Sequence, residues 1–267
     1  MEGHEVVVRI LGKAIIPAES FYMGLTEQVA SVNQPSDWKR VREVLKELKS
    51  KGDQSNVEGM ARFGITPSDA YGLSMPELRR LGRSLGRDHE LAQGLWATGN
   101  FEARVLASLV DEPKKVSPQQ MEEWVEGFDN WAICDGCCSN LFDKTPYAYQ
   151  KALKWSRRDP EFTRRAGFSL MAALAVHDKR AEDARFLEFL PEILSQAEDE
   201  RNYVKKAVNW ALRQIGKRNR RLNMEAIKVA LKLKGSKSAA ARWVASDALR
   251  ELTGDAVKAR LNRRSSP

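Results

Sequence analysis

Apolar residues recur at helical spacing along almost the whole chain, and helices of one style return at a nearly fixed interval. The stretches around Arg165, Lys206 and Trp243 are alike in character and are separated by 41 and 37 residues. Helix-pair repeats of the HEAT and armadillo kind have about this period. Because stacked repeats share one continuous core, a chain of 267 residues can form a single array. The sequence therefore predicts an all-α, HEAT-like helical-repeat solenoid with a concave basic face.

The ends of the chain differ from its middle. Residues 1–35 show no convincing periodicity, and we expect an N-terminal extension there. The repeat domain is expected over residues 36–258. Residues 259–267 are polar and basic and end in proline, which is typical of a frayed C-terminal tail.

Local signals mark where individual helices begin. Ser74 is a typical helix cap, and Pro76 and Glu77 are typical of a first helical turn. Asp129 or Asn130 stands where a cap is needed for the helix that carries Trp131. These signals place the motifs described below on helices.

The chain is basic, and its cations are clustered. Lys and Arg number 44 against 36 Asp and Glu, which gives a net charge of +8 and a pI of about 9.4. A domain this basic indicates a polyanionic partner, and nucleic acid is the favoured one. Few acidic residues are interleaved in the two most basic stretches, so ion pairs within one helix do not neutralise them. These stretches contain Arg157, Arg158, Arg164 and Arg165, and then Lys205, Lys206, Arg213, Lys217, Arg218, Arg220 and Arg221.

Neither a membrane nor a metal ion is an expected partner. No apolar run approaches the length of a membrane span. Cys134, Cys137 and Cys138 lie close together in an odd count, which favours reduced thiols in the cytoplasm. A structural zinc site needs a full set of ligands, and no histidine is near these thiols in the sequence. We therefore expect a monomeric, cytoplasmic and nucleoid-associated protein with no metal and no cofactor.

Three short segments share one kind of chemistry. Trp131 and Asp135 are four residues apart, as are Lys206 and Trp210, so each pair shares a helix face. Arg213 adds a cation beside the second pair. A carboxylate, two aromatic faces and several cations together suit a negatively charged polymer with a cationic reaction centre. A tryptophan taken singly is more often a core residue, so this interpretation depends on the recurrence of the pairing.

The ordered set of motifs resembles the DNA alkylation repair family of AlkD-like DNA glycosylases, which are built of HEAT-like repeats. That family carries a Trp-x-x-x-Asp helix, a helix with an Arg-Ala step, and a Lys-Ala-x-x-Trp-x-Leu-Arg helix. The similarity covers roughly residues 36–255. The matching segments here are Trp131-Ala132-Ile133-Cys134-Asp135, Arg165-Ala166 and Lys206-Ala207-Val208-Asn209-Trp210-Ala211-Leu212-Arg213, preceded by Gly64-Ile65-Thr66-Pro67, Met75-Pro76-Glu77-Leu78-Arg79-Arg80 and Phe101-Glu102-Ala103-Arg104.

The resemblance implies a hydrolase that cleaves N-glycosidic bonds in duplex DNA. Its substrates would be positively charged alkylated purines such as 3-methyladenine and 7-methylguanine, removed in base excision repair. Asp135, Trp131 and Trp210 are then the expected catalytic residues. The expected DNA-binding residues are Arg164, Arg165, Lys205, Lys206 and Arg213.

Two other functions stay open. Where the family often has Trp-Trp-Asp, this chain has Asn130-Trp131-Ala132, so a catalytically inactive DNA-binding repeat protein is one alternative. A protein-interaction scaffold of the HEAT type is the other. A scaffold does not need a carboxylate, two tryptophans and a cluster of cations at one place, which favours the enzyme.

Overall fold

The structure is a computed structural model that describes residues 36–263, and the predicted extension over residues 1–35 lies outside the described residues. All elements within the described range are helices. The α-helices are Ser36–Ser50 (α2), Gln54–Met60 (α3), Met75–Leu85 (α4), His89–Ala97 (α5), Phe101–Val110 (α6), Pro118–Glu126 (α7), Trp131–Asn140 (α8), Ala148–Ser156 (α9), Glu161–His177 (α10), Asp183–Leu187 (α11), Leu190–Gln196 (α12), Asn202–Gly216 (α13), Arg220–Lys234 (α14), Ala239–Leu252 (α15) and Asp255–Arg263 (α16). Two 3-10 turns, Ala61–Phe63 (η1) and Phe142–Lys144 (η2), complete the set.

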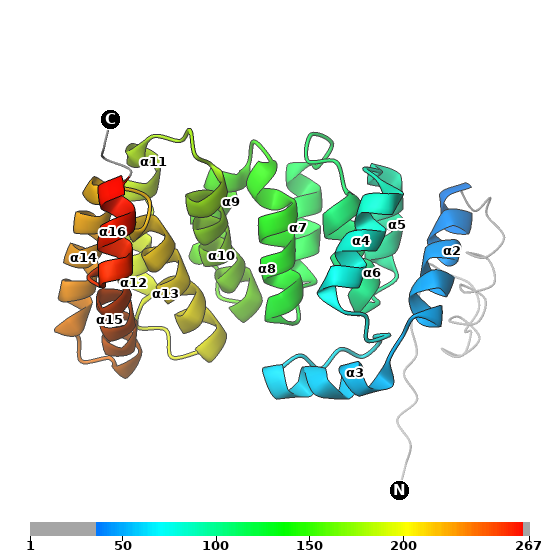
Figure 1. The fold of residues 1–267 in the computed structure, drawn as a ribbon, viewed down its shortest axis with the longest axis horizontal. Coiled ribbons are helices and arrows are strands. Elements are labelled where there is room, and N and C mark those ends of the chain that lie inside the picture. Colours follow the sequence, from blue (N-terminus) through cyan, green and yellow to red (C-terminus); the bar gives the residue numbers. More distant parts are fainter. Residues whose placement is uncertain (1–35, 264–267) are drawn as a thin grey trace, which may run out of the picture.

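The helices form two layers. The inner layer consists of α6, α8, α10, α13 and α15, each of which packs on the next in chain order. The helices between them, including α7, α9 and α14, pack against this layer. Figure 1 shows the helices side by side in a row that follows the sequence from its blue end to its red end. This arrangement confirms the predicted all-α helical-repeat fold.

The helix starts follow the capping signals of the sequence. Ser74 and Glu77 form a capping box at α4, in which each side chain bonds the other residue's backbone N–H. At α8 the cap is Asn130, whose Oδ1 accepts a hydrogen bond from the Ile133 N–H at 3.0 Å. This cap orients the first turn of α8, and Trp131 is the first residue of that turn.

The centre of the array is α10, a buried helix of 17 residues. It packs most extensively against α13 and α9. Gly167 makes the approach to α9 possible, because a Cβ at this position would lie 2.3 Å from the Ser156 backbone nitrogen. Within the core, the rings of Trp96 and Trp124 stack with centroids 4.2 Å apart. These two tryptophans therefore have the structural role that is usual for this residue.

Two regions differ from a plain row of helix pairs. Helix α3 lies below the row in Figure 1, across the ends of the other helices. At the other terminus, α16 extends through Lys258 to Arg263, so the predicted boundary after Lys258 falls inside a helix. Within residues 36–263, no helix combines the length and apolar content needed to cross a bilayer.

The three cysteines of α8 are buried, and two of them contact the backbone of α10. The thiols of Cys134 and Cys138 point to the carbonyl oxygens of Phe162 and Ala166, at 3.6 and 3.5 Å. Burial raises the pKa of Cys137 and of Cys138, so both are protonated thiols at neutral pH. In the described part of the chain, no group of three or more His, Cys, Asp or Glu side chains is arranged to hold a metal ion.

We predict that the three thiols are inert in the folded protein. A disulfide reagent such as dithiobis-nitrobenzoate should label them only at the rate of unfolding, because buried thiols are inaccessible to the reagent. Addition of EDTA should leave the melting temperature unchanged. Rapid labelling in native buffer, or a stoichiometric metal found by elemental analysis and lost together with folding, would contradict this.

Candidate active site

Three successive inner-layer helices meet at one cavity. Helix α8 contributes Trp131 and Asp135, α10 contributes Arg165, and α13 contributes Lys206 and Trp210. All five were predicted as site residues from the sequence, and the structure brings them together. The cavity has a volume of about 580 Å³. Its remaining lining residues are Arg62, Phe63, Gly64, Asn202 and Tyr203.

Asp135 is the only carboxylate among the described residues that line this cavity. Arg165 binds it with two parallel hydrogen bonds, from Nε to Oδ1 at 3.0 Å and from Nη2 to Oδ2 at 2.6 Å. The Ser169 hydroxyl donates a third hydrogen bond to Oδ1 at 2.7 Å. A carboxylate has about four lone-pair sites, so one acceptor position remains open. The Asp135 side chain is 21% exposed, so its partners do not enclose the carboxylate fully.

Arg165 is buried, which differs from the expectation that its guanidinium faces DNA phosphates. Only 6% of the residue is exposed, and its Nη1 donates to the Tyr203 carbonyl oxygen at 2.6 Å. Burial opposes its charge, but the adjacent Asp135 carboxylate raises the pKa of Arg165, so it stays protonated. Its donors therefore serve Asp135 and α13, and we regard it as a residue that positions the carboxylate.

The two tryptophans of the cavity are partly buried, unlike Trp124 of the core. The Trp131 indole N–H donates to the Phe63 carbonyl oxygen at 2.8 Å. When the Gln214 amide is oriented with its oxygen toward Trp210, that oxygen accepts a hydrogen bond from the indole N–H at 3.1 Å. Both rings are thus fixed at their polar edges, and they line the cavity near Asp135.

The other predicted DNA-binding residues differ in whether their charged groups are already paired within the protein. Lys206 is exposed at the cavity, with no hydrogen bond or ion pair recorded for it in the described structure. The Lys205 ammonium lies over the Trp243 ring, 5.3 Å from its centroid. By contrast, Arg164 pairs with Asp199 at 2.7 Å, and Arg213 pairs with Glu251 at 2.6 Å. Of the five predicted cations, Lys206 is therefore the one best placed to meet a ligand in the cavity.

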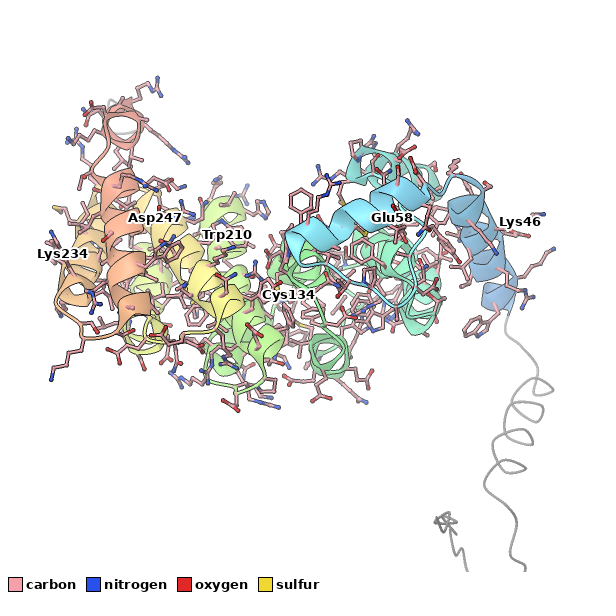
Figure 2. The ribbon with its side chains drawn as sticks, turned by 90° about the horizontal axis from the view of Figure 1, so that it is seen from below. Lys46, Glu58, Cys134, Trp210, Lys234 and Asp247 are labelled. Atoms are coloured by element: carbon pink, nitrogen blue, oxygen red, sulfur yellow. The ribbon has the colours of Figure 1, made fainter. Side chains whose placement is uncertain are left out.

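Sequence reasoning missed the segment that closes the far side of the cavity. Arg62, Phe63 and Gly64 follow α3, about 70 residues before the next lining residue, Trp131. The Gly64 carbonyl accepts a hydrogen bond from the Tyr203 hydroxyl at 3.2 Å. Figure 2 shows α3 extending toward the helix that carries Trp210. The sequence signal for this segment is the motif that begins at Gly64.

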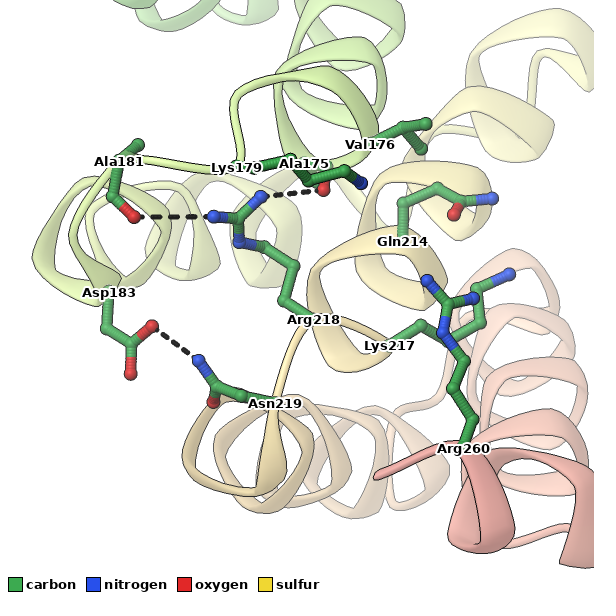
Figure 3. A pocket seen from close by; sticks show the side chains of 10 residues that line it. All are labelled: Ala175, Val176, Lys179, Ala181, Asp183, Gln214, Lys217, Arg218, Asn219 and Arg260. Atoms are coloured by element: carbon green, nitrogen blue, oxygen red, sulfur yellow. Dashed lines mark hydrogen bonds between the residues drawn. The ribbon is translucent and has the colours of Figure 1, made fainter. Parts of the chain in front are cut away.

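A second cavity of about 350 Å³ lies at the opposite, C-terminal ends of α10 and α13. Figure 3 shows Arg218 reaching the carbonyl oxygens of Ala175 and Ala181, to which it donates at 2.8 and 3.3 Å. Lys217 pairs with Glu251 at 2.5 Å. Cations at helix C-termini stabilise unpaired carbonyl groups. The charge of this cavity is thus used within the fold, and the first cavity remains the candidate active site.

Comparison with known proteins agrees with the geometry. A family model described as DNA alkylation repair enzyme matches residues 44–252. The uncharacterized proteins Lin0241 of Listeria innocua and Lmo0209 of Listeria monocytogenes are 27% and 26% identical over 128 residues. Each match covers 46% of this chain and 57% of the relative, so the chain spans little more than half of their length.

A solved structure has the same fold. It is described as belonging to a new family of proteins related to the HEAT-like repeat DNA glycosylases with affinity for branched DNA structures. It superposes with a TM-score of 0.67 at 19% identity and covers 83% of this chain and 95% of its own. The HEAT-like repeat architecture predicted from the sequence is therefore confirmed. With the family model matched over most of its length, the chain belongs to the family of DNA alkylation repair enzymes.

Proposed function

We propose that the protein is a DNA glycosylase that excises positively charged alkylated purines, of the 3-methyladenine and 7-methylguanine type, from duplex DNA. The observation that carries this proposal is the cavity in which Trp131 and Trp210 lie near one partly exposed carboxylate, Asp135. Family membership supports the choice of DNA repair.

The chemistry of a cationic base suits a site with a single carboxylate. When the bond between C1′ and the base nitrogen breaks, its electron pair goes to the base and cancels the positive charge. No acid is needed to protonate the leaving group. The positive charge moves to the sugar, which becomes an oxocarbenium ion. The enzyme therefore has to stabilise this charge and direct water to C1′.

Asp135 is suited to both tasks. Its negative charge opposes the developing charge on the sugar, and its open acceptor position can bind the attacking water. As water adds to C1′, its proton passes through the carboxylate to solvent. The flanking rings of Trp131 and Trp210 favour the cationic sugar, because aromatic faces attract cations. Arg165 and Ser169 hold the carboxylate in one orientation throughout.

DNA binding depends on the cations that remain free. Lys206 stands at the cavity, and Arg62 is exposed on its opposite side. Both can reach phosphates that flank a lesion whose sugar lies near Asp135. Such contacts fix the register of the duplex without reading its sequence.

We predict that Asp135→Asn lowers the rate of base release from alkylated duplex DNA by about 10²–10³-fold, because loss of one well-placed electrostatic group has this effect. Release of methylated bases by purified protein measures it. The same change breaks a buried ion pair and should lower the free energy of unfolding by up to about 3–5 kcal/mol. Assays must therefore be run well below the melting temperature of the variant.

Asp199→Asn is the matched control. The Asp199 side chain is only 6% exposed and is held by Arg164 and Arg201, yet it does not line the cavity. These arginines hold the pKa of Asp199 near 2 against the effect of burial. This control should lose stability and keep base release. The catalytic assignment is wrong if Asp135→Asn works at the wild-type rate, or if both variants lose activity alike.

We also predict that affinity for duplex DNA falls steeply with salt, since phosphate neutralisation releases counterions. Lys206→Ala should weaken binding to all sequences and reduce the slope of log K against log salt by about one. Lys232→Ala, an exposed lysine on α14 away from the cavity, should leave the slope unchanged. Binding that is indifferent to salt would favour a protein-interaction scaffold.

A further inference from the structure

Phe63 is the most exposed large hydrophobic residue in the described part of the chain, with 69% of its surface open to solvent. A phenyl ring in water gives up the stabilisation that burial would provide. The ring lies at the end of η1 and lines the same cavity as Asp135. An apolar group kept in water beside a candidate active site indicates a ligand that covers it.

The backbone that carries this ring is fixed from both sides of the cavity. The carbonyl of Phe63 accepts from the Trp131 indole of α8, and the carbonyl of Gly64 accepts from the Tyr203 hydroxyl of α13. These partners are 68 and 139 residues away in the chain. Two residues that line the cavity therefore also hold Phe63 in place.

The fit at Gly64 adds to this rigidity. Its φ is +69°, a conformation that glycine adopts without the strain found for other residues. A Cβ at Gly64 would lie 2.2 Å from the Tyr203 hydroxyl oxygen. The turn at Gly64 thus packs closely against Tyr203. This contact fixes the backbone next to Phe63, while the Phe63 ring itself stays exposed.

We propose that Phe63 is a wedge that enters a base step of duplex DNA next to the lesion; this rests on the proposed function, which places DNA in the cavity. Architectural proteins insert Phe, Leu, Ile or Met between base pairs, which unstacks them and bends the duplex. Arg62, exposed beside the wedge, is placed to meet a flanking phosphate. Opening of the stack brings the sugar of the lesion toward Asp135. Phe63 is therefore a positioning residue, distinct from the residues that act on C1′.

The test uses a duplex with a tetrahydrofuran abasic analogue and 2-aminopurine as the neighbouring base. This analogue has no base to release, and 2-aminopurine becomes brighter when it unstacks. Wild-type protein should raise the fluorescence at saturation. Phe63→Ala should abolish the rise and weaken binding by roughly 5- to 100-fold, the usual range for loss of one stacked aromatic. Phe63→Leu should retain part of the rise, because leucine is also a wedge residue.

Met224→Ala controls for loss of an exposed apolar side chain, since Met224 is 57% exposed on α14. It should behave like wild type. The wedge is overturned if Phe63→Ala saturates with the wild-type rise, or if wild-type protein binds without any rise. Catalysis is judged separately: protein that releases no methylated base but still brightens 2-aminopurine would refute the proposed activity and retain the wedge.

Discussion

The bidentate pair between Asp135 and Arg165 is the interaction on which the candidate site depends. It joins α8 to α10, and the third donor of the same guanidinium reaches the Tyr203 carbonyl at the start of α13. One buried arginine thereby sets the register of three successive inner-layer helices at the ends where the cavity opens. The pair also keeps the carboxylate oriented, because a planar guanidinium matches the geometry of a carboxylate. A lysine at position 165 would supply the charge without this orientation.

Removal of either partner would leave a buried charge uncompensated, so the site residues also contribute to stability. The segment after α3 depends on the same register. Its two anchors come from Trp131 on α8 and Tyr203 on α13, so its place over the cavity follows from the relative position of these helices. The Asp135 carboxylate, the two cavity tryptophans and the segment that carries Phe63 are thus parts of one structure, and a shift of α10 would move all of them.

Features that depend on residues close in sequence were predictable, such as helix caps and shared helix faces. Features that depend on contacts between neighbouring repeats were not. The caps at Ser74 and Asn130 follow from neighbouring residues, as does the shared face of Trp131 and Asp135. The charges of Arg164 and Arg213 seemed unopposed because few acids lie close to them in sequence. Their partners lie one repeat further along, 35 and 38 residues away, where stacking brings equivalent positions together. Likewise, Trp124 and Trp210 both occur in amphipathic helices, and only the packing of the layers separates a core ring from a cavity ring.

In the proposed reaction, the site stabilises charge and does not protonate the leaving base. The most direct measurement compares base release by purified protein from duplexes that differ only in the charge of the lesion, 7-methylguanine against neutral hypoxanthine. We expect release of the cationic base and negligible release of the neutral one, because Asp135, the carboxylate that lines the cavity, stabilises a charge that only the cationic base leaves behind without protonation. Equal release of both bases, or release of neither, would contradict it.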